Sequence, residues 1–230
     1  MTVRTLALAL AAALAALTPA AFPADPADGW ADLFNGKDLD NWVQRGGKAN
    51  YRIDGKELVG SSVPKTPNSF LCTKRDYGDF ILELEFKVHP DLNSGVQVRS
   101  QYAPEGKTVE SAGKSIKGTA GGRVFGYQIE IDPKPRAWTG GVYDEGRRAW
   151  LKDLKDNEPA RKAFKQNEWN KFRIECKGDS IKTWLNEVAA AELKDSATPS
   201  GFIALQVHGV GEKTEPLEVR FRGLRIKEIK

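Results

Sequence analysis

The sequence is poor in the residues that build metal sites and disulfide frameworks, with two cysteines and two histidines among 230 residues. Cys72 and Cys176 have no second ligand at the spacing of a zinc site. Each lies in a strand-like segment, where it either pairs with the other cysteine in an oxidising compartment or stays a buried thiol. The sequence leaves these two alternatives open.

A strong excess of one charge is also absent. The chain has 35 basic and 31 acidic residues, which gives a formal net charge of +4. The two signs are mixed along the chain, and basic residues cluster only in short patches such as Arg147-Arg148. This pattern argues against a nucleic-acid-binding protein.

Long hydrophobic runs are confined to the start of the chain. Arg4 is followed by an Ala/Leu run that ends at Thr18 and Pro19. This order is typical of a secretory signal peptide, expected over residues 1–24 with cleavage after Ala20 or Ala24. An uncleaved anchor helix is the alternative. We expect the remaining residues 25–230 to be exported to the periplasm or the cell exterior, without a membrane span.

Helical periodicity is weak beyond that segment, except over residues 158–165. Short alternating or apolar runs recur instead between Gly and Asp turns, as in YRIDGKELVG, DFILELEFKV, SGVQVRSQY, WNKFRIECKG and GFIALQVHG. Many strands without alternating helices predict an all-β domain. We expect residues 25–230 to form a single two-sheet jelly-roll sandwich. The outer face of one sheet would then be free to curve around a ligand.

The stretch GYQIEID raises the question of what that outer face does. Tyr127, Ile129 and Ile131 alternate with Gln128, Glu130 and Asp132. Other strands carry further polar residues on the same pattern: Glu83 with Glu85, Gln97 with Arg99, and Gln206 with His208. Amides, carboxylates and arginine can bind sugar hydroxyls in bidentate pairs. A face that merely meets water is the alternative.

Tryptophans supply a second indication of carbohydrate binding, because sugar rings stack on aromatic faces. The chain has six. Trp138 and Trp150 lie in the loop-rich stretch 133–151, and we expect one of them to face a ligand. Trp184 alternates with Ile181 and Leu185 and is expected in the core.

Several segments in order along the chain resemble one family. They are DLFNGKDLDNW, PNSFLCTKRDYGDFILELEFKV, NSGVQVRS, GYQIEID, WTGGVYDEGRRAWL, NEWNKFRIECKG, IKTWLN and GFIALQVHG. Together they are similar to the 3-keto-disaccharide hydrolase domain family, from about Trp30 to Lys230. The resemblance implies a concanavalin A-like jelly roll. The chain departs from the family at Asn186-Glu187, where Asn-Gly is usual, and at Arg222-Gly223, where Arg-Asn is usual.

The resemblance also implies cleavage of glycosides whose C3 hydroxyl has already been oxidised to a ketone. The ketone acidifies the C2 proton, so a base can remove it, the C1 leaving group departs by β-elimination, and water adds back. This route needs a base near C2, a cation or donor at the C3 oxygen and an acid at the glycosidic oxygen. A sugar 3-oxidoreductase is expected upstream, since no segment of this chain resembles a dinucleotide-binding motif.

The polar residues supply candidates for these roles. Glu130 or His208 would be the base, and Arg99 would stabilise the enolate oxygen or fix a hydroxyl. Further candidates would contact the sugar, namely Gln128, Gln206, Gln97, Glu85, Trp138, Tyr143, Asp144, Glu145 and Arg148. The alternative interpretation of Asp144-Glu145 is an ordinary turn that forms an ion pair with Arg147 or Arg148. A divalent ion on Glu130, Asp132 and His208 is a weaker candidate, and no cofactor is otherwise implied. The segment 104–123 is expected to be a mobile loop that covers the site.

Two other functions remain open at this level. One is a non-catalytic carbohydrate-binding domain, because folds of this kind often only bind. The other is a conventional glycosidase that uses Glu85 and Glu130 as its two carboxyls. The identity of the sugar, its anomer, the leaving group and the oligomeric state do not follow from the sequence.

Overall fold

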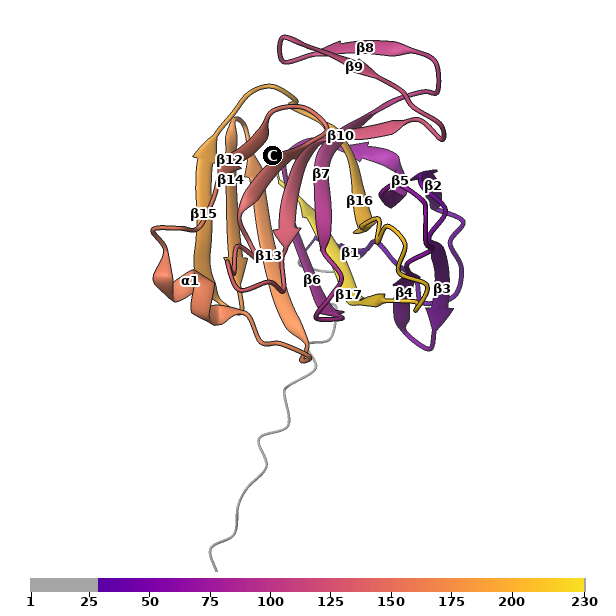
Figure 1. Cartoon of the computed structure of the whole chain (residues 1–230). Coiled ribbons are helices and arrows are strands. Elements are labelled where there is room, and N and C mark those ends of the chain that lie inside the picture. Colours follow the sequence, from indigo (N-terminus) through magenta and orange to yellow (C-terminus); the bar gives the residue numbers. More distant parts are fainter. Residues whose placement is uncertain (1–28, 230) are drawn as a thin grey trace, which may run out of the picture.

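Two antiparallel sheets, packed face to face, make up most of the computed structural model, which describes residues 29–229 (Figure 1). The eight-stranded sheet has the order β15 (Val188–Lys194), β14 (Ser180–Leu185), β13 (Asn170–Lys177), β6 (Phe80–Val88), β17 (Glu218–Glu228), β4 (Glu57–Ser61) and β3 (Asn50–Asp54), and β1 (Trp30–Asp32) pairs with β17. The seven-stranded sheet has the order β12 (Ala149–Lys152), β11 (Val142–Glu145), β10 (Arg123–Ile131), β7 (Ser94–Ala103), β16 (Gly201–Val207), β5 (Ser69–Tyr77) and β2 (Trp42–Gly46). This arrangement confirms the predicted all-β two-sheet jelly roll.

The core lies between the two sheets. Strand β6 contributes inward-facing residues such as Phe86, and β10 contributes Tyr127, Ile129 and Ile131 to the same buried cluster. Because strand residues alternate between faces, Gln128 and Glu130 of β10 are placed on the outer face of the seven-stranded sheet. The predicted separation of the apolar and polar residues of GYQIEID is therefore confirmed.

Local turn chemistry explains the connections at two places. The β14–β15 turn contains Asn186 and Glu187 with φ of 48° and 71°. A two-residue hairpin turn of this kind needs positive φ at both positions, and Asn meets that need well. The short helix α1 (Glu158–Ala163) begins after Asn157, whose Oδ1 accepts a hydrogen bond from the Ala160 backbone N–H at 3.2 Å.

The sequence predicted a mobile loop over residues 104–123, but this segment contains regular structure. It contains a two-stranded hairpin of β8 (Thr108–Ser111) and β9 (Lys114–Lys117), which projects from the end of β7 and β10 at the top of Figure 1. The hairpin is tied to the seven-stranded sheet, because Arg147 Nη1 donates to Ser111 Oγ at 2.8 Å. Alternation was hard to see here because the two strands are short and polar.

The two cysteines do not pair. Cys72 lies in β5 and Cys176 in β13, and both are buried free thiols. Burial raises the pKa of each thiol to about 12. The structure thus selects the second of the two alternatives left open by the sequence.

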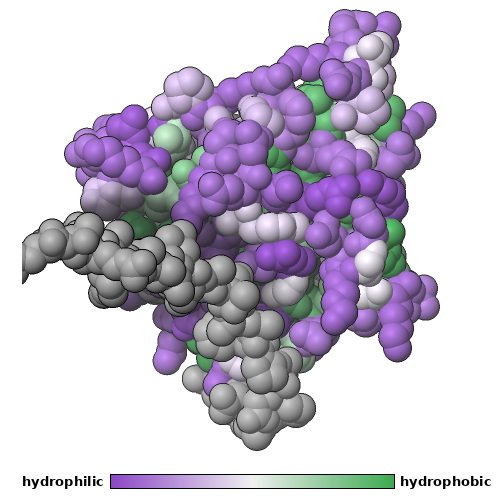
Figure 2. Space-filling model, turned by 90° about the horizontal axis from the view of Figure 1, so that it is seen from below, coloured by the Kyte–Doolittle hydropathy of each residue, from purple (hydrophilic) through white to green (hydrophobic). Residues whose placement is uncertain are grey.

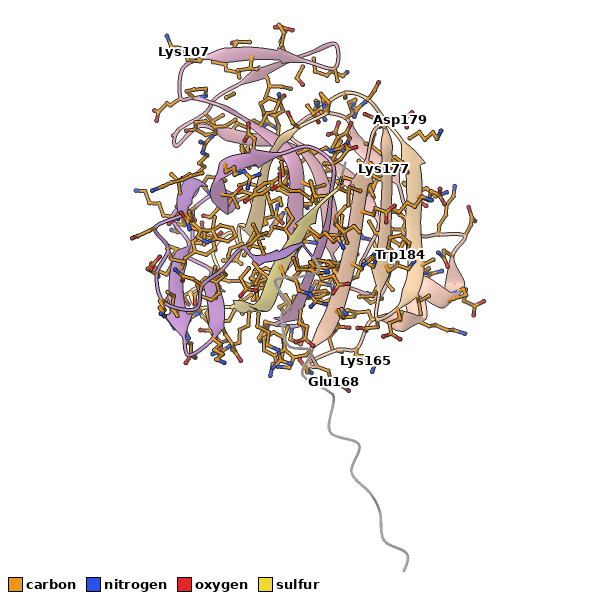
Figure 3. The ribbon with its side chains drawn as sticks, turned by 180° about the vertical axis from the view of Figure 1, so that it is seen from behind. Lys107, Lys165, Glu168, Lys177, Asp179 and Trp184 are labelled. Carbon is orange, nitrogen blue, oxygen red and sulfur yellow. The ribbon has the colours of Figure 1, made fainter. Side chains whose placement is uncertain are left out.

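The surface away from the core is mainly polar. Seen from below, hydrophilic residues cover most of the visible face and hydrophobic ones are scattered (Figure 2). Trp184 lies on the outer face of the eight-stranded sheet, not in the core as expected, with the Arg173 guanidinium 5.8 Å from its ring centre (Figure 3). Within residues 29–229, no helix is both long and apolar enough to cross a membrane. The expected signal peptide lies outside the described residues.

Candidate functional site

A polar hollow of about 320 Å³ lies on the outer face of the seven-stranded sheet. Two adjacent strands form its floor and one wall. Gln128 of β10 lies opposite Tyr143 of β11 in the pairing of these strands. Side chains from the strands and their flanking loops complete it. The lining residues are Asn68, Asn93, Gln128, Glu130, Arg136, Tyr143, Glu145, Trp150 and His208.

Glu130 is the most elaborately held side chain in this hollow. Asn93 Nδ2 donates to its Oε1 at 2.7 Å, and Gln128 Nε2 donates to its Oε2 at 2.8 Å. Gln97 Nε2 in turn donates a hydrogen bond to Gln128 Oε1 at 2.7 Å. The side-chain oxygen of Gln97, Oε1, accepts a hydrogen bond from Ser100 Oγ at 2.6 Å. This chain of hydrogen bonds fixes which end of each amide faces its neighbour, so the Glu130 carboxylate has one defined position.

The backbone beneath Gln128 has to be free of a side chain. A Cβ placed on Gly95 would lie 2.6 Å from the Gln128 side chain. Gly95 therefore provides the space in which Gln128 reaches Glu130, a close approach that only glycine allows.

Two carboxyls in the hollow hold protons more tightly than usual. Burial raises the pKa of Glu130, and the hydrogen bonds from Asn93 and Gln128 only partly oppose this. Burial also raises the pKa of Glu145 to about 7, and the neighbouring charge of Glu130 adds to the rise, while Arg123 and Asn68 oppose it. Near neutral pH the pair therefore holds a proton that can be transferred.

Arg136 brings positive charge to the rim of the hollow. Its Nη2 lies 3.6 Å from Glu130 Oε1, and its Nε donates to Asp132. Asp132 is buried and its Oδ1 also accepts from the Lys134 backbone N–H at 3.2 Å, so it organises the loop that carries Arg136. Asp132, on the polar face of GYQIEID, therefore holds Arg136 in place.

An aromatic wall closes one side. Trp150 lines the hollow, and Trp138 packs edge-on against it, with ring centres 4.8 Å apart and planes at 82°. Tyr143 also meets Trp150 edge-on at 5.3 Å. Of the two candidate tryptophans, Trp150 lines the hollow, whereas Trp138, the predicted contact residue, packs against the core behind it.

The hollow gathers part of the predicted site. Gln128, Glu130, Tyr143, Glu145 and His208 all line it. His208 is exposed at the edge, with its Nδ1 2.8 Å from the Gly209 carbonyl oxygen. Gln97 lies one hydrogen bond further back, where it positions Gln128. Gln206 is fully buried in β16 and does not line the hollow, and its side-chain amide has no hydrogen-bond partner among the described residues.

Arg99 does not belong to the site. Its side chain is 0% exposed and donates to the carbonyl oxygens of Gly78 and Gly178 and to Asp79, all within 2.8 Å. Two residues of β7, Val98 and Arg99, face only one residue of β16 at this point, and Arg99 has φ of 47°. This β-bulge breaks the alternation on which the prediction rested.

Glu85 is excluded by the pairing of the strands. It lies on β6, in the eight-stranded sheet, and its carboxylate accepts from Arg222 Nε at 2.7 Å on the solvent side. The core separates this face from Glu130. A conventional glycosidase built on Glu85 and Glu130 is therefore incompatible with the fold.

Asp144 points away from the hollow, whereas its two neighbours in the chain, Tyr143 and Glu145, line it. It is 0% exposed and binds Arg147, also 0% exposed, and Arg148. Arg148 further pairs with Asp195 at 2.9 Å. Asp144 thus fixes the β11–β12 turn, and the ion-pair alternative considered for it is confirmed.

The predicted metal set is not assembled. Among residues 29–229, no group of three His, Cys, Asp or Glu side chains is arranged to hold a metal ion. The Glu130 carboxylate accepts hydrogen bonds from the amides of Asn93 and Gln128, and the Asp132 carboxylate accepts one from Arg136. His208 lies at the rim of the hollow.

Sequence reasoning missed three lining residues, Asn68, Asn93 and Arg136. All lie in loops, where strand alternation gives no direction. Asn68 and Asn93 immediately precede β5 and β7, the strands next to the site, and this placement is the signal that would have found them.

The geometry defines a jelly roll with a polar hollow of about 320 Å³ on one sheet. The sequence profile described as the 3-keto-alpha-glucoside-1,2-lyase-like domain matches residues 29–227. The chain therefore belongs to this family. No curated protein matches the chain in sequence.

Solved structures share the fold. A candidate glycosyl hydrolase from Parabacteroides distasonis superposes with a TM-score of 0.58 at 16% identity, covering 89% of this chain and 96% of that one. The carbohydrate-binding module CBM66 from Bacillus subtilis gives 0.56 at 15%, covering 82% and 96%. A β-1,3-1,4-glucanase (lichenase) from a mouse hindgut metagenome gives 0.53 at 13%, covering 87% and 98%. At these identities the similarity concerns the fold alone.

Proposed function

We propose that the protein cleaves 3-keto-glycosides by C2 deprotonation, β-elimination and rehydration. The observation that carries this proposal is the pair Glu130 and Glu145, two carboxyls with raised pKa values in one polar hollow. The family description, a lyase-like domain for 3-keto-α-glucosides, supports the choice of substrate class.

The reaction needs one base and one acid. The base takes the C2 proton, the electron pair of the C2–H bond forms the C1–C2 double bond, and the C1–O bond to the leaving group breaks. The acid protonates the departing oxygen. Water then adds across the double bond, with its hydroxyl at C1 and its proton at C2, and the free 3-keto sugar results.

Glu130 fits the role of base. The two amides hold its carboxylate in one orientation, and its raised pKa makes it a stronger base than an ordinary glutamate. Glu145 fits the role of acid, because a pKa of about 7 leaves much of it protonated near neutral pH. The two carboxyls therefore supply one candidate base and one candidate acid in the same hollow.

Two further residues fit the remaining needs. Arg136, and not Arg99, is the cation near Glu130, and it would stabilise negative charge on the C3 oxygen. Trp150 lines the hollow, with the Arg136 guanidinium 5.1 Å from its ring centre, and would contact the sugar ring. His208, at the exposed edge, remains the second candidate for proton transfer and would serve the water-addition step.

A two-carboxylate glycosidase is the second candidate, now with Glu130 and Glu145 as the pair, since both line the same hollow. A paired assay separates the two. The purified protein is incubated with a glucoside and with its 3-keto form, and leaving-group release is followed with and without chelator. Release from the keto form alone supports elimination. Release from the unoxidised glucoside supports the conventional route, and binding without release supports a binding module.

Glu130→Gln is the variant that tests the residue assignment. We expect turnover to fall about a hundredfold or more, because the glutamine side-chain amide cannot accept the C2 proton. Glu85→Gln is the matched control, since it makes the same chemical change on the opposite face of the sandwich. If Glu130→Gln keeps activity within a few-fold of the wild type while Glu85→Gln behaves identically, Glu130 is not the base.

The cellular setting is part of the same proposal. An exported protein would meet its substrate in the periplasm or outside the cell. The proposed substrate carries a ketone at C3, so we expect a sugar 3-oxidoreductase to supply it.

A further inference from the structure

A second hollow of about 630 Å³ opens beside the first and shares Tyr143 and Glu145 with it. Its other charged lining residues are all cationic, namely Lys114, Arg123, Arg147 and Arg148, although the Arg147 side chain is 0% exposed, so its guanidinium does not face the hollow. Glu145 therefore stands at the junction, with a neutral-to-acidic hollow on one side and a basic one on the other.

The four cations differ in how their charge is compensated. Arg147 and Arg148 are paired with the buried Asp144, and Arg148 also with Asp195. Lys114 and Arg123 make no ion pair with any described residue. Among the lining residues, only Glu145 opposes the charges of Lys114 and Arg123, and Arg123 acts on its carboxyl without forming a close ion pair.

Local backbone structure places Arg123 at the mouth. It is the first residue of β10, and a Cβ on Gly146 would lie 2.9 Å from its Nε. Gly146, with φ of 63°, lets the Arg123 side chain lie directly over the β11–β12 turn. Lys114 approaches from the β8–β9 hairpin, so two independent elements place cations around one hollow.

We propose that the second hollow receives the leaving group and selects one that carries a carboxylate or another anionic group. This inference rests on the proposed function. If Glu145 protonates the departing oxygen while the sugar lies in the first hollow, the leaving group must extend past Glu145. The basic hollow is the space that Glu145 and Tyr143 border on that side.

A third hollow of about 290 Å³ also borders Glu145 and is the competing location. It is lined partly by apolar residues such as Phe70 and Val124, and it includes Arg123 but not Lys114. The two locations therefore differ in one testable respect. A leaving group in the second hollow responds to both cations, and one in the third responds to Arg123 alone.

The test compares the 3-keto-glucosides of 4-hydroxybenzoate and 4-hydroxybenzamide, which are nearly isosteric and differ in charge. We expect kcat/KM to favour the carboxylate by about tenfold, a typical gain for hydrogen bonds to an ionised group. The preference should fall as ionic strength rises, because the hollow is open to solvent.

Three variants locate the source of the preference. Arg123→Gln and Lys114→Gln should each lower the ratio of the two kcat/KM values by about threefold or more. The ratio cancels any change in the acidity of Glu145, which affects both substrates. Lys107→Gln is the control, because the substitution removes the same charge from the same hairpin. Lys107 does not line the second hollow (Figure 3).

Each outcome decides something. A ratio near one for the wild type, or equal loss in Lys107→Gln, overturns the anionic subsite while leaving the proposed function in place. An effect of Arg123→Gln without one of Lys114→Gln moves the leaving group to the third hollow and overturns the placement. Cleavage of neither substrate refutes the proposed function. In that case the affinities of the two unoxidised glucosides, measured calorimetrically in the same variants, test the subsite. Tighter binding of the carboxylate that weakens in Arg123→Gln and Lys114→Gln supports it, and equal affinities overturn it.

Discussion

Replacement of Glu145 by glutamine should change how the stability of the protein depends on pH. In the folded protein, burial and the charge of Glu130 raise the pKa of Glu145 from the ordinary 4.5 to about 7. Each pKa unit corresponds to about 1.4 kcal/mol, so ionised Glu145 costs the folded state about 3 kcal/mol. Partial exposure of the side chain lets solvent screen the charge, and we expect about 2 kcal/mol.

The sign of the effect follows from proton binding. Between pH 4.5 and about 7 the folded protein keeps the Glu145 proton that the unfolded chain has released. Stability is therefore highest below the lower pKa and falls as pH rises through the higher one. Glutamine does not ionise, so Glu145→Gln should gain about 2 kcal/mol relative to the wild type between about pH 4 and about pH 8.

Urea unfolding at a series of pH values measures this difference. Glu83→Gln is a control of opposite sign, because Arg225, Arg173 and Lys171 more than offset burial and lower the pKa of Glu83. Its deficit relative to the wild type should grow as pH rises through the ordinary pKa. If the gain of Glu145→Gln is the same at every pH, Glu145 is not a proton-holding group and the acid role proposed for it is wrong.

Three further predictions concern activity and stability. Gly95→Ala should lower kcat/KM about tenfold or more with little change in KM, because the new methyl group displaces Gln128 from Glu130; unchanged kinetics would show that the amide chain is dispensable. Trp150→Ala should raise KM about tenfold through loss of the stacking surface, whereas the control Trp184→Ala, on the opposite face, should not. Asp144→Asn should lower the free energy of unfolding by about 3–5 kcal/mol in a denaturant titration, since it leaves the fully buried Arg147 without its partner; a loss below 1 kcal/mol would contradict this.

The fold class and part of the site follow from local sequence patterns. Period-two alternation in strands such as β6 and β10 was strong enough to predict two sheets and their inner faces. The same alternation correctly placed Gln128 and Glu130 on a polar face, because β10 is regular over that stretch. The order of the family segments supplied the expected chemistry.

Which polar faces lie next to each other depends on how the strands pair and pack. Glu85 and Glu130 look alike in sequence, yet strand pairing puts them on opposite sides of the core. Arg99 follows the alternating pattern until a bulge, created by pairing with β16, turns it inward. Asn93 and Arg136 approach Glu130 only because loops distant along the chain converge there. Alternation fixes the face that a side chain takes within its own strand, whereas the neighbours of that face depend on long-range pairing that no local pattern contains.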